Sequence, residues 1–296
     1  MLCWRGFSGK PFQGWRDDMT KAASISDIKT DAHRVYQEDG FFLCDWPVVS
    51  ADVIANAVHG MDEVRAGRYE TGVPLHTSKW NPGDDPNLLC KMEMTQRQNL
   101  AIRELVSQSS IGEWAAAVTG ASIVQVWWVQ LLYKPPSAKP TDGITNVGWH
   151  QDRQYWGAWE DDSELLTAWV ALSDVTAEAG PMRYVRGSHQ WGERDEGDFH
   201  GSDHEAQRAS YELPKGAEWN EVQAILPPGG IAFHTNFTLH ASGPNLTDKP
   251  RRSFAVHMRT ERSRPKQGRR ERLTAFIDDE VICPIIYREE GAILPR

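Results

Sequence analysis

Three side chains in two separate segments have the types and spacing of metal ligands. His150 and Asp152 stand two residues apart, and His240 follows ninety residues after His150. Two histidines and one carboxylate can bind one face of an Fe(II) ion and leave the other coordination positions open for a co-substrate and O₂. In a chain with 10 His and 41 acids, one or two His-x-acid pairs are expected by chance, so the pair needs support from its surroundings.

The surroundings predict strands that would bring these side chains together with a carboxylate-binding group. Alternate residues of a strand share a face, so we expect His150 and Asp152 to point together into a barrel, as do His240 and Ser242. Arg251 follows an eight-residue turn and could return beside the His240 strand. Arginine binds a carboxylate through two parallel hydrogen bonds, which lysine cannot do. The pattern favours an oxidative enzyme over a metal-stabilised scaffold.

Other histidines offer alternatives to this ligand set. His234 lies six residues before His240 with the same strand parity, but it lacks the following H-x-S and arginine. His257 shares the inward parity of Arg251, and we interpret it as a hydrogen-bonded core histidine. His189, in a Gly-Ser-His sequence, is expected to hold a turn.

Composition and charge exclude several classes of protein. With 40% hydrophobic and 25% charged residues, the chain has the composition of an ordinary globular protein. Its formal net charge of −9 argues against binding to nucleic acid, which needs a basic surface. The basic run at residues 259–272 is interpreted as a solvated loop, with a patch for an anionic substrate as the alternative. Four widely spaced cysteines, no secretory signal and no apolar run of membrane-spanning length predict a cytoplasmic protein without a membrane partner.

Turn signals divide the chain into an N-terminal arm and one folded domain. We expect a loosely ordered arm at residues 1–24 and a single jelly-roll domain at 25–296. This domain would have a helical part at about 25–120, a barrel at about 121–260 and a C-terminal extension at 261–296. The loop at residues 67–90 is a candidate lid, and the polar insert at 190–220 is expected to cover the barrel mouth.

The predicted elements come in a helical half followed by a β-rich half. Helices are predicted at residues 26–38, 51–65 and about 95–118. Strands are predicted at residues 41–46, 123–133, 148–150, 165–172, 182–185, 222–226, 231–234, 238–242 and 252–259, with a strand-like segment at 281–287. This order predicts a mostly β fold with flanking helices. The expected architecture is a double-stranded β-helix, the cupin-like jelly roll, with the N-terminal helices packed on one sheet.

The order of the motifs between residues 37 and 260 resembles the phytanoyl-CoA dioxygenase family, a branch of the Fe(II)- and 2-oxoglutarate-dependent oxygenases. The resemblance rests on His150-Gln151-Asp152, Trp169-x-Ala171-Leu172, Gly187-Ser188-His189 and His240-x-Ser242 followed by Arg251, in that order. Two departures are visible: Ala241 stands where the family usually has Gly, and Ala179 where it often has Asn. Both are small changes in packing, and neither removes a ligand.

The resemblance implies a cofactor, a co-substrate and roles for particular residues. It implies Fe(II) on His150, Asp152 and His240 as the catalytic centre, and 2-oxoglutarate chelated to the metal with its distal carboxylate on Arg251 and Ser242. Further positions that match 2-oxoglutarate contacts of the family are Gln130, Trp169 and Lys91.

The implied reaction is hydroxylation of an unactivated C–H bond with O₂, or a desaturation or cyclisation, with release of succinate and CO₂. The presence of Asp152 favours these reactions over halogenation. Tyr155, Trp156 and Trp149, which surround the His-x-Asp sequence, are candidate substrate-pocket residues, and we expect a small-molecule metabolite as the substrate.

Two other classes of function use the same residues. One is a jelly-roll protein that binds metal or ligand without turnover, and the other is a metal-dependent hydrolase that activates water on the same triad. The carboxylate-binding Arg251 has no obvious use in a hydrolase.

Overall fold

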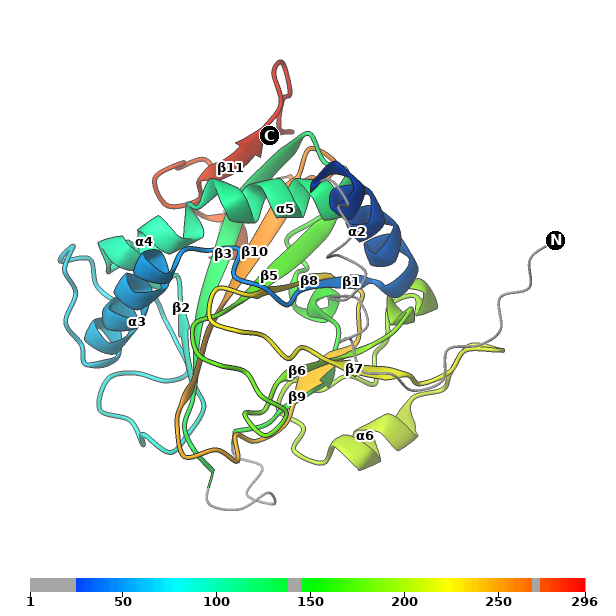
Figure 1. The fold of residues 1–296 in the computed structure, drawn as a ribbon, viewed down its shortest axis with the longest axis horizontal. Helices are drawn as coiled ribbons and strands as arrows, with labels where there is room; N and C mark the ends of the chain where they lie inside the picture. The colour runs from blue at the N-terminus through cyan, green and yellow to red at the C-terminus, as the bar shows by residue number, and fades with distance from the viewer. Residues whose placement is uncertain (1–24, 138–144, 268–271, 296) are drawn as a thin grey trace.

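The computed structural model of the protein describes residues 25–137, 145–267 and 272–295, so the arm expected at residues 1–24 lies outside the described residues. Figure 1 shows two β-sheets with helices over the outer side of the larger one. The larger sheet has seven strands in the order β1-β8-β5-β10-β3-β11, with β2 also paired to β3. The smaller sheet has four strands in the order β4-β9-β6-β7, and the recorded strand pairs of both sheets are antiparallel. The expected jelly-roll fold is confirmed.

The strands lie close to their predicted positions. Those of the larger sheet are β1 (Phe41–Cys44), β2 (Cys90–Glu93), β3 (Ile123–Lys134), β5 (Leu165–Ala171), β8 (Ile231–Thr235), β10 (Arg251–Thr260) and β11 (Ile285–Arg288). Those of the smaller sheet are β4 (Val147–His150), β6 (Met182–Val185), β7 (Glu221–Gln223) and β9 (His240–Ser242). Strand β2 is an addition, because the sequence indicated only a loop that ends there.

Both faces of the larger sheet are buried, which explains why its strands read as nearly continuous apolar runs. In β5, Leu166, Ala168 and Val170 pack outwards with the helices in the main core. The alternate residues Trp169 and Ala171 face inwards, towards Met182 and Tyr184 of the smaller sheet. Alternation along each strand therefore separates a dry outer core from an inner face that can carry polar groups.

The helices that cover the larger sheet are α2 (Ile25–Asp39), α3 (Ala51–Arg65), α4 (Leu100–Val106) and α5 (Ser109–Thr119). The single helix predicted at about residues 95–118 is wrong. A 3₁₀ turn at Thr95–Arg97 comes first, and Asn99 then starts α4 by accepting a hydrogen bond from the Ile102 N–H at 3.1 Å. Asparagine at such a cap satisfies a free backbone donor and begins a new helix, which interrupts the periodic pattern.

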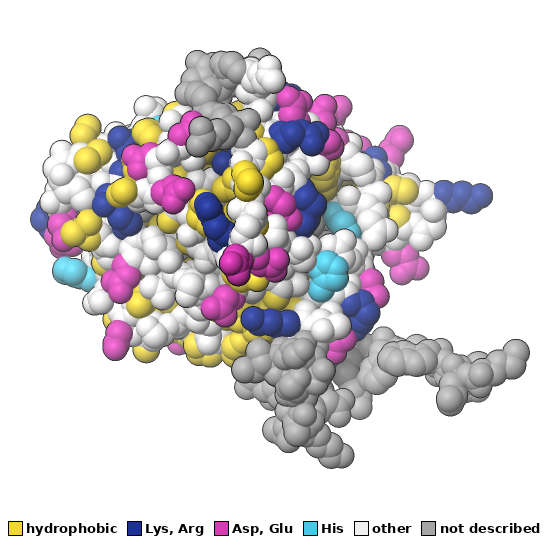
Figure 2. Space-filling model, turned by 90° about the horizontal axis from the view of Figure 1, so that it is seen from above, with side chains coloured by type: hydrophobic (Ala, Val, Ile, Leu, Met, Phe, Trp, Pro, Cys, Tyr) yellow, Lys and Arg dark blue, Asp and Glu magenta, His cyan; other side chains and the backbone are white. Residues whose placement is uncertain are grey.

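The outer surface carries charges of both signs. Figure 2 shows acidic and basic side chains interspersed on the face that is seen from above Figure 1.

The interpretation of residues 259–272 as a solvated loop is wrong at the start of this segment. Arg259 belongs to β10, is buried and donates to Gln125 Oε1 at 2.7 Å. Arg262 pairs with Glu164 at 2.6 Å. Among the described residues, no helix is long and apolar enough to cross a membrane.

The insert at residues 190–220 contains helix α6 (His204–Ser210) and packs against β4. The Gly148 N–H donates to the Phe199 carbonyl at 3.0 Å, and the Asp198 N–H donates to the Trp149 carbonyl at 3.0 Å. The insert can lie this close because residue 148 has no side chain: a Cβ there would stand 2.1 Å from the Asp198 carbonyl oxygen.

We predict that Gly148→Ala loosens the insert. The added methyl overpacks the contact with Asp198, and overpacking of this kind costs about 1–3 kcal/mol. Thermal unfolding should show a lower midpoint, and limited proteolysis should cut faster within residues 192–203. Gly157→Ala is the matched control, because nothing lies within 4 Å of a Cβ at position 157. Equal proteolysis of the two variants would contradict this account of the insert.

Candidate active site

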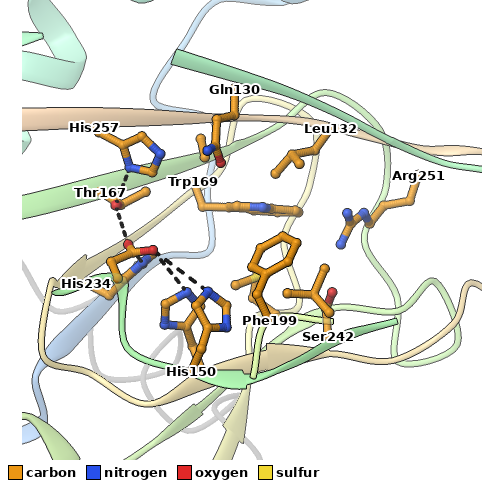
Figure 3. Close-up of a pocket in the computed structure, with 15 residues that line it drawn as sticks. Gln130, Leu132, His150, Thr167, Trp169, Phe199, His234, Ser242, Arg251 and His257 are labelled. Atoms are coloured by element: carbon orange, nitrogen blue, oxygen red, sulfur yellow. Dashed lines mark hydrogen bonds and ion pairs between the residues drawn. The ribbon is translucent and has the colours of Figure 1, made fainter. Parts of the chain in front are cut away.

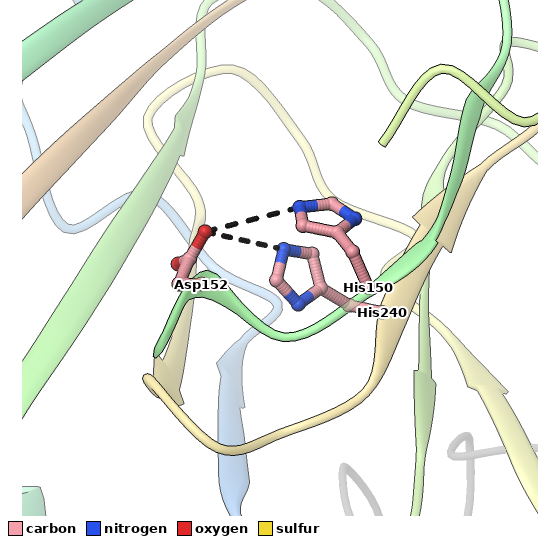
Figure 4. Close-up of side chains that lie close together, drawn as sticks. All are labelled: His150, Asp152 and His240. Carbon is pink, nitrogen blue, oxygen red and sulfur yellow. Dashed lines mark ion pairs between the residues drawn. The ribbon is translucent and has the colours of Figure 1, made fainter. Parts of the chain in front are cut away.

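Three predicted ligands meet on the inner face of the smaller sheet. The pairing of β4 with β9 sets His150 directly opposite His240, and Asp152 begins the 3₁₀ turn that follows β4. The Nε2 atoms of both histidines lie 3.8 Å from Asp152 Oδ1, and one ligand atom from each residue lies within 4.8 Å of the others. Figure 4 shows the two imidazoles side by side with the carboxylate facing both. These three atoms could bind one metal ion.

Backbone hydrogen bonds fix the histidine tautomers that such binding needs. His150 Nδ1 lies 2.8 Å from the Gly148 carbonyl, and His240 Nδ1 lies 2.9 Å from the Thr238 carbonyl. A carbonyl only accepts, so each Nδ1 carries the proton and each Nε2 presents a lone pair to the site. Burial lowers the pKa of His150 to about 4, so its imidazole is neutral near pH 7.

The second carboxylate oxygen of Asp152 is held by the larger sheet. Thr167 Oγ1 donates to Asp152 Oδ2 at 3.1 Å, and His234 Nε2 donates to the same oxygen at 3.3 Å. Tyr184 OH lies 3.2 Å from His234 Nδ1 and supports this tautomer of His234. His234 Nε2 therefore carries a proton, which points at the carboxylate of Asp152, and has no lone pair to offer to a metal ion. His234 is a hydrogen-bond partner of the candidate ligand Asp152.

A row of three side chains crosses the larger sheet beneath Asp152. The strand register places Thr167 between His234 on β8 and His257 on β10. His257 Nδ1 lies 2.8 Å from Thr167 Oγ1. Our interpretation of His257 as a hydrogen-bonded core residue holds for its Nδ1 only. The buried Nε2 of His257 has no partner among the described residues.

The other end of the same cavity carries a buried positive charge. The Arg251 side chain is 2% exposed, donates through Nη1 to the Gly180 carbonyl at 2.9 Å and lies 5.0 Å from the Trp169 ring. Its Nε is buried without a partner, and no ion pair to Arg251 is found within the described ranges. Burial lowers the pKa of Arg251 to about 9, so an arriving anion would be strongly favoured.

Figure 3 shows how Gln130, Trp169 and Ser242 lie around this cavity. All three residues line it, and their contacts with 2-oxoglutarate stay predictions. Lys91 stands beside it: its Nζ lies 4.2 Å from the Phe199 ring and 3.8 Å from Glu93 Oε1. Burial lowers the pKa of Lys91.

The three candidate substrate-pocket residues lie in different places. The ring of Tyr155 is 5.9 Å from that of His150, and the side chain is half exposed. Trp156 packs against Trp127 at 4.9 Å, in a separate aromatic cluster. Trp149 packs against Trp219 at 5.0 Å under the insert. Of the three, only Tyr155 lies beside the triad.

Sequence reasoning missed Thr167 and Phe199. Thr167 has the inward parity of Trp169 on β5, so strand alternation alone could have found it. Phe199 lines the cavity with its ring 5.0 Å from that of His150. It comes from an irregular part of the insert, where no periodic pattern indicates the direction of a side chain.

The two ends of the cavity together fit Fe(II) and 2-oxoglutarate. Two neutral imidazoles and one carboxylate form the facial donor set of non-haem iron oxygenases. The unpaired guanidinium at the far end fits the distal carboxylate of 2-oxoglutarate. The class of protein that this fold and site define is an Fe(II)- and 2-oxoglutarate-dependent oxygenase.

Comparison with known proteins identifies the family. Residues 36–253 match the model of phytanoyl-CoA dioxygenase, PhyH, and the chain belongs to that family. The probable α-ketoglutarate-dependent hypophosphite dioxygenase of Stutzerimonas stutzeri is 24% identical over 231 residues, which cover 76% of this chain and 77% of the relative.

Two solved structures share the fold. The epimerase SnoN, in complex with Fe³⁺, α-ketoglutarate and nogalamycin RO, is 23% identical with a TM-score of 0.65, covering 92% of this chain and 94% of SnoN. The carbocyclase SnoK from nogalamycin biosynthesis is 24% identical with a TM-score of 0.62, covering 83% of this chain and 90% of SnoK.

We predict that Thr167→Val weakens metal binding while the fold is kept. Valine has nearly the same shape and suits a strand, but Asp152 Oδ2 loses one of its two hydrogen bonds, and His257 Nδ1 loses its contact with the Thr167 hydroxyl. Loss of such a contact behind a metal ligand costs about 10- to 100-fold in metal affinity or activity. Anaerobic titration with Fe(II) measures the affinity, and Thr176→Val on the exposed surface is the control. An unchanged affinity in Thr167→Val would show that His234 alone orients Asp152.

Proposed function

We propose that this protein uses Fe(II), 2-oxoglutarate and O₂ to oxidise an unactivated C–H bond of a small-molecule metabolite. The reaction is a hydroxylation, or a desaturation or cyclisation, with release of succinate and CO₂. The observation that carries the proposal is the pairing of two features in one cavity: three convergent ligand atoms, and a buried guanidinium that has no counter-charge among the described residues.

Each part of the cavity has a separate task. His150, Asp152 and His240 hold the iron, which supplies the activation of O₂ when 2-oxoglutarate is chelated to it. Arg251 and Ser242 bind the distal carboxylate. Trp169 lies beside the guanidinium and excludes water from it, and Gln130 offers an amide to the co-substrate from β3. By its place in the family order, Lys91 is a further contact to 2-oxoglutarate.

The substrate is expected to bind beside the candidate metal site, next to loop residues that connect the strands. Tyr155 and Phe199 are the aromatic side chains next to His150, and they come from the turn after β4 and from the insert. The relatives named above include a hypophosphite dioxygenase and enzymes of nogalamycin biosynthesis, so small molecules of very different size are precedented in this fold. These names support a small-molecule substrate for this protein.

The two other classes of function explain the site less well. A metal hydrolase needs the triad and a water molecule, and it leaves the buried Arg251 without a purpose. A relative that has lost turnover would be expected to lose at least one of the three ligands or Arg251, and all four residues are present. Release of succinate that depends on O₂ separates the oxygenase from both.

The first test is the formation of the iron chelate. We expect metal-free protein to give a visible charge-transfer band when Fe(II) and then 2-oxoglutarate are added without oxygen. His240→Ala should lose the band because one of three protein ligands is gone. His59→Ala, which removes an exposed histidine from α3, should keep it. Binding of Fe(II) without a band in the wild-type protein would contradict the oxygenase.

The second test concerns the distal carboxylate. Arg251→Gln removes the charge from the buried end of the cavity, and a buried charged hydrogen bond contributes about 1.5–3 kcal/mol, so the 2-oxoglutarate concentration needed for half-saturation should rise about 10- to 100-fold. Succinate release as a function of 2-oxoglutarate measures the effect. Arg34→Gln on the exposed face of α2 serves as the control. An unchanged affinity for 2-oxoglutarate in Arg251→Gln would show that Arg251 does not bind the distal carboxylate.

A further inference from the structure

A second buried cation lies behind the carboxylate-binding end of the cavity. Lys134 is the last residue of β3 and has no exposed surface. Its ammonium donates to Ser242 Oγ at 2.8 Å, to the Gly243 carbonyl at 2.5 Å and to the Ser242 carbonyl at 3.4 Å. These oxygens satisfy its hydrogen bonds, but no ion pair in the described part of the chain balances its charge. A buried charge without a counter-charge is costly, so a role is expected for it.

Lys134 and Arg251 form one positive region. They stand directly opposite each other in the register of β3 and β10, so their side chains share the inner face of the sheet. Burial lowers the pKa of Lys134, and the guanidinium groups of Arg251 and Arg183 lower it further. An anion bound beside Arg251 would relieve the repulsion between the two cations.

The hydrogen bond from Lys134 also sets the direction of the Ser242 hydroxyl. In its charged form the Lys134 ammonium has donors and no lone pair, so Ser242 Oγ accepts from it. The hydroxyl proton of Ser242 is then free to donate elsewhere. Ser242 lines the cavity together with Arg251, so a ligand in the cavity is the available acceptor.

We propose that Lys134 is a positioning residue that makes the site selective for a 2-oxo acid with a distal carboxylate. It holds the Ser242 hydroxyl as a donor towards that carboxylate and adds a second buried positive charge to that of Arg251. This inference rests on the proposed function. The distal carboxylate is the group by which the site would distinguish 2-oxoglutarate from a 2-oxo monocarboxylate of equal length.

The experiment compares two ligands in two proteins. Fe(II)-loaded protein is titrated without oxygen with 2-oxoglutarate and with 2-oxovalerate, which has the same chelating end and a methyl group in place of the distal carboxylate. In Lys134→Met we expect the affinity for 2-oxoglutarate to fall about tenfold or more, as for loss of a buried charged contact, while the affinity for 2-oxovalerate stays unchanged. Lys249→Met, in the exposed part of the turn between β9 and β10, is the matched control.

A second variant covers the case in which Lys134→Met does not fold. Ser242→Ala removes the hydroxyl that Lys134 orients and leaves the ammonium with its two carbonyl acceptors. It should also reduce the preference for 2-oxoglutarate over 2-oxovalerate, and an unchanged preference in this variant overturns the role of the hydroxyl.

The outcomes separate this inference from the proposed function. If the wild-type protein forms no chelate with either acid, the proposed function fails and this inference fails with it. If the wild type prefers 2-oxoglutarate and Lys134→Met keeps that preference, only the role of Lys134 is overturned. Equal losses of affinity for both acids in Lys134→Met would show that Lys134 has only a structural role, and they would overturn its role in selectivity as well.

Discussion

The antiparallel pairing of β4 with β9 is the contact on which the site depends. It sets His150 opposite His240, and it leaves their Nδ1 atoms beside carbonyl oxygens of their own segments. Asp152 reaches the same point only because the chain turns sharply after β4. The smaller sheet thus supplies both histidines, the turn after β4 supplies Asp152, and the larger sheet holds the second carboxylate oxygen of Asp152 through Thr167. Either sheet alone would leave the ligand set incomplete or unoriented.

The distribution of charge follows from the same two-sheet arrangement. The inner face carries one carboxylate near the histidines and two cations, Arg251 and Lys134, at the other end. These charges cannot neutralise one another across the cavity, so each end is left to attract a ligand of opposite sign. A metal cation and a dicarboxylate joined to it satisfy both ends at once. The cost of these buried charges is offset by apolar burial elsewhere, above all in the main cluster of buried apolar residues between the larger sheet and the helices.

The regular alternation of inward and outward residues along strands explains how much of the fold and of the candidate site could be predicted from the sequence. It gave the barrel strands to within a few residues, and it gave the inward direction of Ser242 and Arg251. The expectation that Arg251 returns beside the His240 strand is wrong, because β10 pairs with β3 and β5 of the larger sheet. The pattern failed at residues 95–118, where a capping hydrogen bond from the Ile102 N–H to Asn99 Oδ1 divides a pattern that reads as one helix. It also placed Asp152 on a strand, whereas this residue begins a 3₁₀ turn. Trp149 and Trp156 flank the ligands in sequence, but contacts with the insert and with Trp127 take them elsewhere.

The division between strands and connections explains how one fold can serve different reactions. The candidate metal and co-substrate contacts lie on paired strands or directly after one, where a change of register would displace them together. Tyr155 and Phe199 come from connections that are free of that constraint, and connections tolerate insertion and substitution. Solved structures only 23–24% identical to this chain therefore share the fold, and the wall that Tyr155 and Phe199 form beside the candidate metal site is free to differ. In this protein that wall depends on Gly148, because the absence of a side chain there lets the insert bring Phe199 to His150.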